Sequence, residues 1–117
     1  MRAQEERRRK ALGRRGELVA AWLLRLRGLR ILDRNVRVPG ACEVDLVARD
    51  GRVLVLVEVK ARRSLDAAEP VVAGRRAALR RAGEALMAAP WAGWAQAVRF
   101  DVVAVEGYRL RHLRGAF

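Results

Sequence analysis

Apolar residues recur at spacings of three and four near the start of the chain. The members of this apolar face are Leu18, Val19, Trp22, Leu23 and Leu26. Such spacing predicts a helix over residues 5–27, with Trp22 in the core and Gly28 as the residue that caps its C-terminus. Glycine weakens a helix, so a start near Gly16 is the alternative.

Three segments typical of β-strands follow, at residues 29–38, 42–49 and 52–61. The second segment alternates charged and apolar residues, and the third begins with apolar residues at every position, as in a central strand buried on both faces. The Asp50-Gly51 pair between them predicts a two-residue hairpin turn.

The rest of the chain predicts a loop at residues 62–69, a second helix at 70–88, a loop at 89–96, and strands at 97–105 and 108–113. The order is helix, three strands, helix, and one or two strands. This order predicts an α/β fold with a mixed central sheet flanked by helices. We see no internal repeat or linker and expect one domain over residues 1–117, with residues 1–12 as a flexible basic segment.

Composition excludes several classes of protein. Hydrophobic residues make up 52% of the chain, which argues against global disorder. No apolar run approaches the roughly 18 residues of a membrane span. A single cysteine, Cys42, excludes an intrachain disulfide and fits a reducing compartment, so we expect a cytoplasmic protein.

The strongly basic charge points to a polyanionic partner. The chain carries 25 Lys and Arg residues against 13 acidic ones, a formal net charge of +12. Nucleic acid is the leading candidate, with DNA favoured, because basic residues that neutralise phosphates release counterions. The candidate phosphate-binding residues are Arg14, Arg15, Arg62, Arg75, Arg76 and Arg80. The alternative is that these arginines only form solvated helix faces.

The hairpin also brings charged residues together. Counting outward from an Asp50-Gly51 turn pairs Arg49 with Arg52, Asp45 with Leu56, and Glu43 with Glu58. Glu43, Asp45, Glu58 and Lys60 then share one face of the sheet. Like charges directly opposite each other destabilise a sheet. Such a costly arrangement is expected at functional sites. A hard divalent cation, Mg²⁺ or Mn²⁺, resolves the conflict and can activate water against a phosphodiester. The other interpretation of Glu58 and Lys60 is a surface ion pair.

These residues resemble a known signature. Glu43-Val44-Asp45-Leu46, followed by Val57-Glu58-Val59-Lys60, is similar to the PD-(D/E)XK nuclease motif. The closer resemblance is to the bacterial YraN-like family of small endonuclease-like proteins, which are similar to archaeal Holliday-junction resolvases. It runs from about residue 13 to residue 105.

The resemblance implies a restriction-endonuclease-like core and assigns roles to matching positions. Asp45 and Glu58 would be metal ligands, Lys60 the catalytic lysine, and Glu17 a further acidic residue of the site. Glu43 matches a position of unassigned role. The chain departs from the family where Arg75 replaces a helix lysine, which keeps the charge but not the capacity to lose a proton. It departs again at Ala41 and Cys42, where glycine is more usual.

The resulting hypothesis is a metal-dependent nuclease acting on DNA, branched or structured DNA included. A non-catalytic nucleic-acid-binding module on the same fold is the first alternative, and an RNA- or ribosome-associated protein is the second. Resolvases act as dimers, so a homodimer is one expectation.

Four further residues are assigned structural roles. We expect Trp91 and Trp94 to pack on the second helix or in a dimer contact, with stacking on bases as the alternative. Asp101 is expected to pair with Arg99 or another arginine, and His112 to lie on the surface.

Overall fold

The computed structural model describes residues 2–61, 69–106 and 109–117, with the side chains of residues 14–60, 75–106 and 109–117. The helices are α1 (Arg2–Leu26), α3 (Glu69–Met87) and the short 3-10 helix η1 (Pro90–Ala92). The strands are β1 (Arg30–Arg37), β2 (Glu43–Asp50), β3 (Val53–Ala61), β4 (Ala97–Glu106) and β5 (Arg109–Leu113). The predicted α/β order is confirmed, and η1 is an addition inside the predicted loop.

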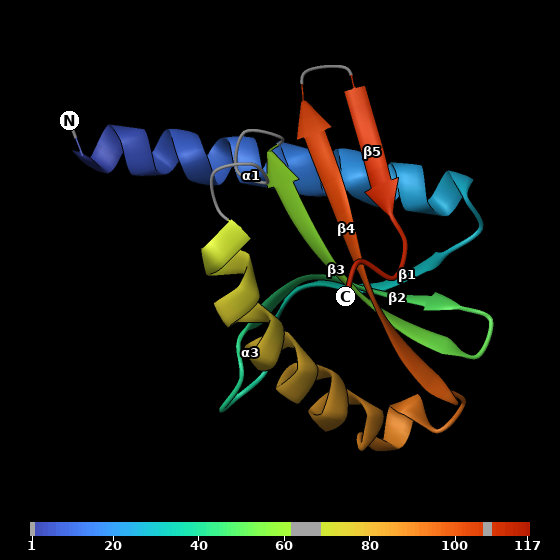
Figure 1. The fold of residues 1–117 in the computed structure, drawn as a ribbon. Coiled ribbons are helices and arrows are strands. Elements are labelled where there is room, and N and C mark those ends of the chain that lie inside the picture. The colour runs from blue at the N-terminus through green and yellow to red at the C-terminus, as the bar shows by residue number, and fades with distance from the viewer. Residues whose placement is uncertain (1, 62–68, 107–108) are drawn as a thin grey trace.

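The strands form one mixed sheet in the order β1-β2-β3-β4-β5. Only β3 and β4 are parallel, because the chain crosses between them through α3, whereas the other neighbours are antiparallel. The two long helices lie on opposite faces of this sheet (Figure 1). Ala20, Ala21 and Leu24 of α1 pack on one face, and Leu79 and Ala82 of α3 pack on the other.

The buried face of α1 shares only Leu23, which is half-buried against the core, with the predicted face. Ala20, Ala21 and Leu24 are buried, whereas Trp22 is 62% exposed, so the prediction of Trp22 in the core is wrong. Most residues between positions 18 and 26 are apolar, so periodicity alone could not select a face. The small alanine side chains let the helix approach the sheet closely. No helix among the described residues combines the length and apolarity needed to cross a bilayer.

The hairpin between β2 and β3 turns one residue later than predicted. Asp50 pairs with Val53 and Arg49 with Leu54, so Gly51 and Arg52 form the turn, and Gly51 has a φ of +60°. The predicted register is therefore wrong: each residue of β2 pairs two positions further along β3 than expected. This corrects the predicted pairs Arg49–Arg52, Asp45–Leu56 and Glu43–Glu58. Arg99 of β4 donates a 2.8 Å hydrogen bond to Oδ2 of Asp50, which helps to hold Asp50 in the ladder.

Candidate active site

The carboxylate cluster lies where the β2–β3 ladder ends. The recorded pairs run from Asp50–Val53 to Leu46–Val57, so Asp45 and Glu58 are the next residues on the two strands. A register error of two residues leaves every side chain on its predicted face, because side chains alternate with a period of two. Instead of a further ladder bond, the main-chain N–H of Val59 donates a 2.8 Å hydrogen bond to Oδ2 of Asp45.

Glu58 is almost completely buried and is held by two cations. Its side chain is 7% exposed. Arg75 of α3 donates from Nε to Oε2 of Glu58 at 2.7 Å, and Nζ of Lys60 lies 3.6 Å from Oε1. Arg75 also donates from Nη2 to the main-chain oxygen of Glu43 at 2.6 Å. Arg75 therefore ties α3 to both strands of the hairpin, in addition to neutralising Glu58.

Asp45 is the most perturbed titratable group of the cluster. Burial raises the pKa of Asp45 from its ordinary value of 3.8 to about 7, and the charges of Glu58 and Glu17 raise it further, against the opposing effect of the Val59 N–H. A carboxyl group that is partly protonated at neutral pH is typical of functional sites. Burial and the neighbouring carboxylates thus favour the neutral form of Asp45 in the folded chain.

Glu17 reaches this region from α1. A Cβ built on the preceding residue, Gly16, would lie 3.7 Å from Cγ1 of Val59, so this part of the helix packs directly on β3. Glu17 is half-buried, and its charge acts on Asp45. The structure therefore brings Asp45, Glu58, Lys60 and Glu17 together. The Glu43 side chain is exposed, and its recorded contact is made by its main-chain oxygen.

The donor set fits a magnesium-type ion better than a transition metal. No group of three or more His, Cys, Asp or Glu side chains within the described residues is arranged to hold a metal ion. Mg²⁺ does not need one, since it commonly takes one or two carboxylates and completes its shell with water and phosphate oxygens. Asp45 and Glu58 supply that minimum of hard oxygen ligands.

Apart from Arg75, which contacts Glu58, the predicted phosphate-binding arginines fall into three groups. Arg14, Arg15 and Arg80 are exposed and available to a partner. Arg76 is half-buried, with its guanidinium 5.3 Å from the ring centroid of Phe117. Arg62 lies outside the described residues.

A second charged cluster lies on β4 and β5, and only its Arg99–Asp101 pair was predicted. Asp101 is buried and accepts hydrogen bonds from Nε and Nη2 of Arg99 at 2.9 and 3.1 Å, which confirms the predicted pairing. The prediction that His112 lies on the surface is wrong, because its side chain is buried with Nε2 2.8 Å from Asp101. Gly115 N–H is the fourth donor, at 3.0 Å. Asp101 stands among apolar residues in β4, a setting that is typical of a buried side chain. That position is the one signal in the sequence that could have indicated a buried partner for Asp101, such as His112.

Relatives of the chain match it along most of its length. Residues 16–105 match the model described as Uncharacterised protein family UPF0102. A UPF0102 protein of Renibacterium salmoninarum is 47% identical over 113 residues, covering 89% of this chain and 93% of the relative. A second, from Anaeromyxobacter dehalogenans, is 49% identical over 122 residues, covering 93% of this chain and 85% of the relative. A third, from Geobacter sulfurreducens, is 44% identical over 118 residues, covering 92% of this chain and 89% of the relative. The chain therefore belongs to the UPF0102 family, the YraN-like family that its motifs resemble.

Proposed function

We propose that this protein is a metal-dependent nuclease that hydrolyses phosphodiester bonds in DNA, branched or structured DNA included. The observation that carries the proposal is the convergence of Asp45 and Glu58 at the open end of the β2–β3 ladder, with Lys60 3.6 Å from Glu58. The net charge of +12 favours a polyanionic substrate. The family resemblance of these positions supports the same conclusion.

In this proposal Asp45 and Glu58 hold a Mg²⁺ or Mn²⁺ ion. When bound, such an ion polarises a phosphodiester and lowers the pKa of a coordinated water. The Val59 N–H fixes one oxygen of Asp45, and Arg75 fixes one oxygen of Glu58, so both carboxylates are oriented before a ligand arrives. Asp45 must lose its proton when it becomes a ligand, so binding is expected to strengthen as the pH rises through about 7.

The cationic residues of the site stabilise the negative charge that develops on the phosphate during the reaction. Lys60 presents an ammonium group beside Glu58, where it can stabilise a phosphorane-like transition state. The exposed Arg14, Arg15 and Arg80 supply contacts to the DNA backbone away from the reacting phosphate.

A non-catalytic nucleic-acid-binding module is the second candidate. The specific observation in its favour is that Glu58 already has two cationic partners, Arg75 and Lys60, as in a structural ion-pair network. In that case the basic surface alone would carry the function. Replacing Asp45 by asparagine would then leave DNA binding unchanged or tighten it, since it removes negative charge.

Metal titration separates the two candidates. Mg²⁺ and Mn²⁺ are titrated calorimetrically into the wild type, the double variant Asp45→Asn, Glu58→Gln, and a control variant Glu84→Gln, whose side chain is exposed on α3. The nuclease proposal expects saturable binding in the wild type and the control, and none in the double variant. The titration is repeated with uncleavable DNA that keeps its non-bridging phosphate oxygens, because a phosphate oxygen can complete the shell of the ion.

Cleavage is then assayed on four-way junctions, flaps, duplexes and single strands. Asp45→Asn and EDTA should each abolish cleavage while DNA binding persists. If the wild-type protein binds no metal even with uncleavable DNA present, the nuclease proposal is wrong and the non-catalytic binding module is retained. Cleavage that survives both Asp45→Asn and EDTA would show that the active site lies elsewhere.

A further inference from the structure

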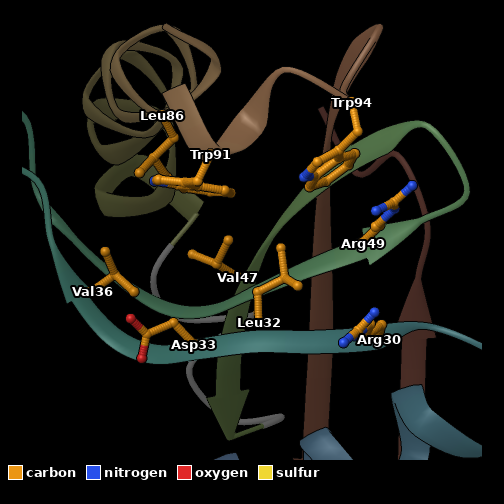
Figure 2. Close-up of a pocket in the computed structure, with 9 residues that line it drawn as sticks. All are labelled: Arg30, Leu32, Asp33, Val36, Val47, Arg49, Leu86, Trp91 and Trp94. Atoms are coloured by element: carbon orange, nitrogen blue, oxygen red, sulfur yellow. The ribbon is translucent and has the colours of Figure 1, made fainter. Parts of the chain in front are cut away.

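A cavity of about 510 Å³ lies on the same face of the sheet as the carboxylate cluster. Trp91 and Trp94, from the segment between α3 and β4, line one side, and Leu32 and Val36 of β1 line the other (Figure 2). Val47 of β2 lies between them. We call this cavity the tryptophan slot. Its volume falls within the roughly 300–1,000 Å³ typical of small-ligand sites.

The aromatic side of the slot is exposed and held in place. The ring centroids of Trp91 and Trp94 are 6.5 Å apart, with an angle of 43° between the ring planes. The guanidinium of Arg49 lies 4.3 Å from the Trp94 ring centroid and donates from Nε to the main-chain oxygen of Gly51 at 2.8 Å. Trp91 is 49% exposed, although an indole is among the most costly side chains to leave in water. The slot therefore presents a fixed planar apolar surface with room for a flat ligand.

The charged residues of the slot restrict that ligand further. Arg30 and Arg49 supply two guanidinium groups, which favour phosphate. Asp33 supplies a carboxylate, which accepts hydrogen bonds from amino groups. A ligand that offers a flat ring, an amino group and a phosphate satisfies all of these features. A nucleotide has this composition, whereas an apolar peptide leaves the guanidinium groups without an anion.

The slot is adjacent to the candidate active site. Val47 lies two residues along β2 from Asp45, which is about 7 Å at the rise of a β-strand. It pairs with Leu56, and Leu56 shares its face of β3 with Glu58. On α3, Arg75 contacts Glu58 and Leu86 lines the slot, a separation of about 16 Å along the helix axis. A single strand of nucleic acid can therefore occupy both places at once.

We propose that the tryptophan slot binds an unpaired base of single-stranded DNA, such as the base at a flap or junction. The base stacks on Trp91, and Arg30 and Arg49 contact its neighbouring phosphates. The choice of DNA as the ligand rests on the proposed nuclease function. The stacking interaction itself does not depend on catalysis, so it can be measured without cleavage.

The test compares the binding of three probes at one fixed salt concentration in EDTA. They are a labelled single strand of about 12 nucleotides, its duplex, and an abasic strand of the same length. The protein is tested as wild type, Trp91→Ala and Trp91→Phe. Trp22→Ala is the matched control, because Trp22 is also an exposed tryptophan, 62% against 49% for Trp91, and lies on α1, on the opposite face of the sheet. Fluorescence anisotropy gives each Kd.

Trp91→Ala should weaken single-strand binding roughly tenfold, the usual effect of removing one stacked base contact. Trp91→Phe keeps an aromatic ring and should therefore restore most of the affinity. Duplex and abasic binding should change less than about twofold, and Trp22→Ala should behave as wild type. A Trp91→Ala protein that binds the single strand like wild type would overturn the proposal, as would equal losses with the abasic probe.

Failure of the slot and failure of the nuclease give different results. If metal binding and cleavage are absent but Trp91→Ala still weakens single-strand binding, the slot is a binding site of the non-catalytic module. If cleavage depends on Asp45 but Trp91→Ala leaves single-strand binding unchanged, the nuclease is retained and the slot proposal is wrong.

Discussion

The main-chain N–H of Val59 donates a hydrogen bond of 2.8 Å to Oδ2 of Asp45. The bond joins β3 to β2 at the point where their recorded ladder has ended at Leu46 and Val57. A side chain thus takes over the role of a main-chain acceptor. This contact keeps Asp45 between the strands beside Glu58, in a place where burial disfavours its charge.

The first prediction concerns Asp45→Asn and stability. Burial raises the pKa of Asp45 from 3.8 to about 7 in the folded chain, so the folded protein binds more protons than the unfolded chain between these two values. The free energy of unfolding therefore falls as the pH rises from about 4 to about 7. Asparagine keeps an acceptor for Val59 and removes this titration. At about pH 8 the variant should be roughly 2–4 kcal/mol more stable, from about 1.4 kcal/mol per pH unit.

Thermal unfolding in EDTA across this pH range checks that prediction. The difference in Tm between Asp45→Asn and wild type should be near zero at about pH 4 and should grow until about pH 7. Glu84→Gln, an exposed change on α3, should show no such trend. An Asp45→Asn protein less stable than wild type at about pH 8 would mean that the charged carboxylate stabilises the fold.

The second prediction concerns Arg75 as a structural link. Its Nε bonds to Glu58 at 2.7 Å and its Nη2 to the main-chain oxygen of Glu43 at 2.6 Å. Arg75→Ala leaves the buried Glu58 with Lys60 alone and should lower the unfolding free energy by about 1–3 kcal/mol. Arg75→Lys should fall between, since an ammonium lacks the planar fork that reaches both partners.

Urea unfolding at neutral pH measures these differences. Arg80→Ala is the matched control, because Arg80 is exposed on the same helix and should change stability by less than about 0.5 kcal/mol. Equal effects of Arg75→Ala and Arg80→Ala would show that the Arg75 contacts contribute nothing net to the stability of the fold.

The β2–β3 hairpin could be predicted because its signals are local. Alternation in β2, the apolar run in β3 and the turn residues near Gly51 suffice for the hairpin. Side chains alternate between the two faces of a strand, so a register error of two residues leaves each side chain on its predicted face. The shared face of Asp45 and Glu58 is therefore correct although the predicted pairs are wrong.

The errors arose where contacts between distant segments decide the outcome. The choice between Trp22 and Ala21 for the face of α1 depends on how closely the helix approaches the sheet, which periodicity does not reveal. The hydrogen bond from Arg75 to Glu58 was not predicted, because it joins residues 17 positions apart. The tryptophan slot depends on β1 lying opposite the segment that follows α3, which is a property of the assembled fold.

The last prediction concerns the buried carboxylate of Asp101. Burial alone would raise the pKa of Asp101, but hydrogen bonds from Arg99, Gly115 and His112 outweigh it and hold the pKa below its ordinary value. A lowered pKa stabilises the fold above the unfolded value, about 3.9, and that contribution is lost as the pH falls through the folded value. Asp101→Asn replaces one accepting carboxylate oxygen by an amide NH₂, which faces groups that are themselves donors. The variant should lower the free energy of unfolding by about 3 kcal/mol at neutral pH.

Urea unfolding of Asp101→Asn at several pH values tests the size and the direction of this effect. The loss should be largest near neutral pH and should shrink below about pH 4, where wild type also loses the charge. Asp50→Asn is the control, because Asp50 shares the Arg99 partner but its side chain is 33% exposed, so its loss should be smaller. If Asp101→Asn were as stable as wild type at neutral pH, the hydrogen bonds would offset no more than the cost of burying the charge. The cluster would then serve to align β4 with β5, without stabilising the fold.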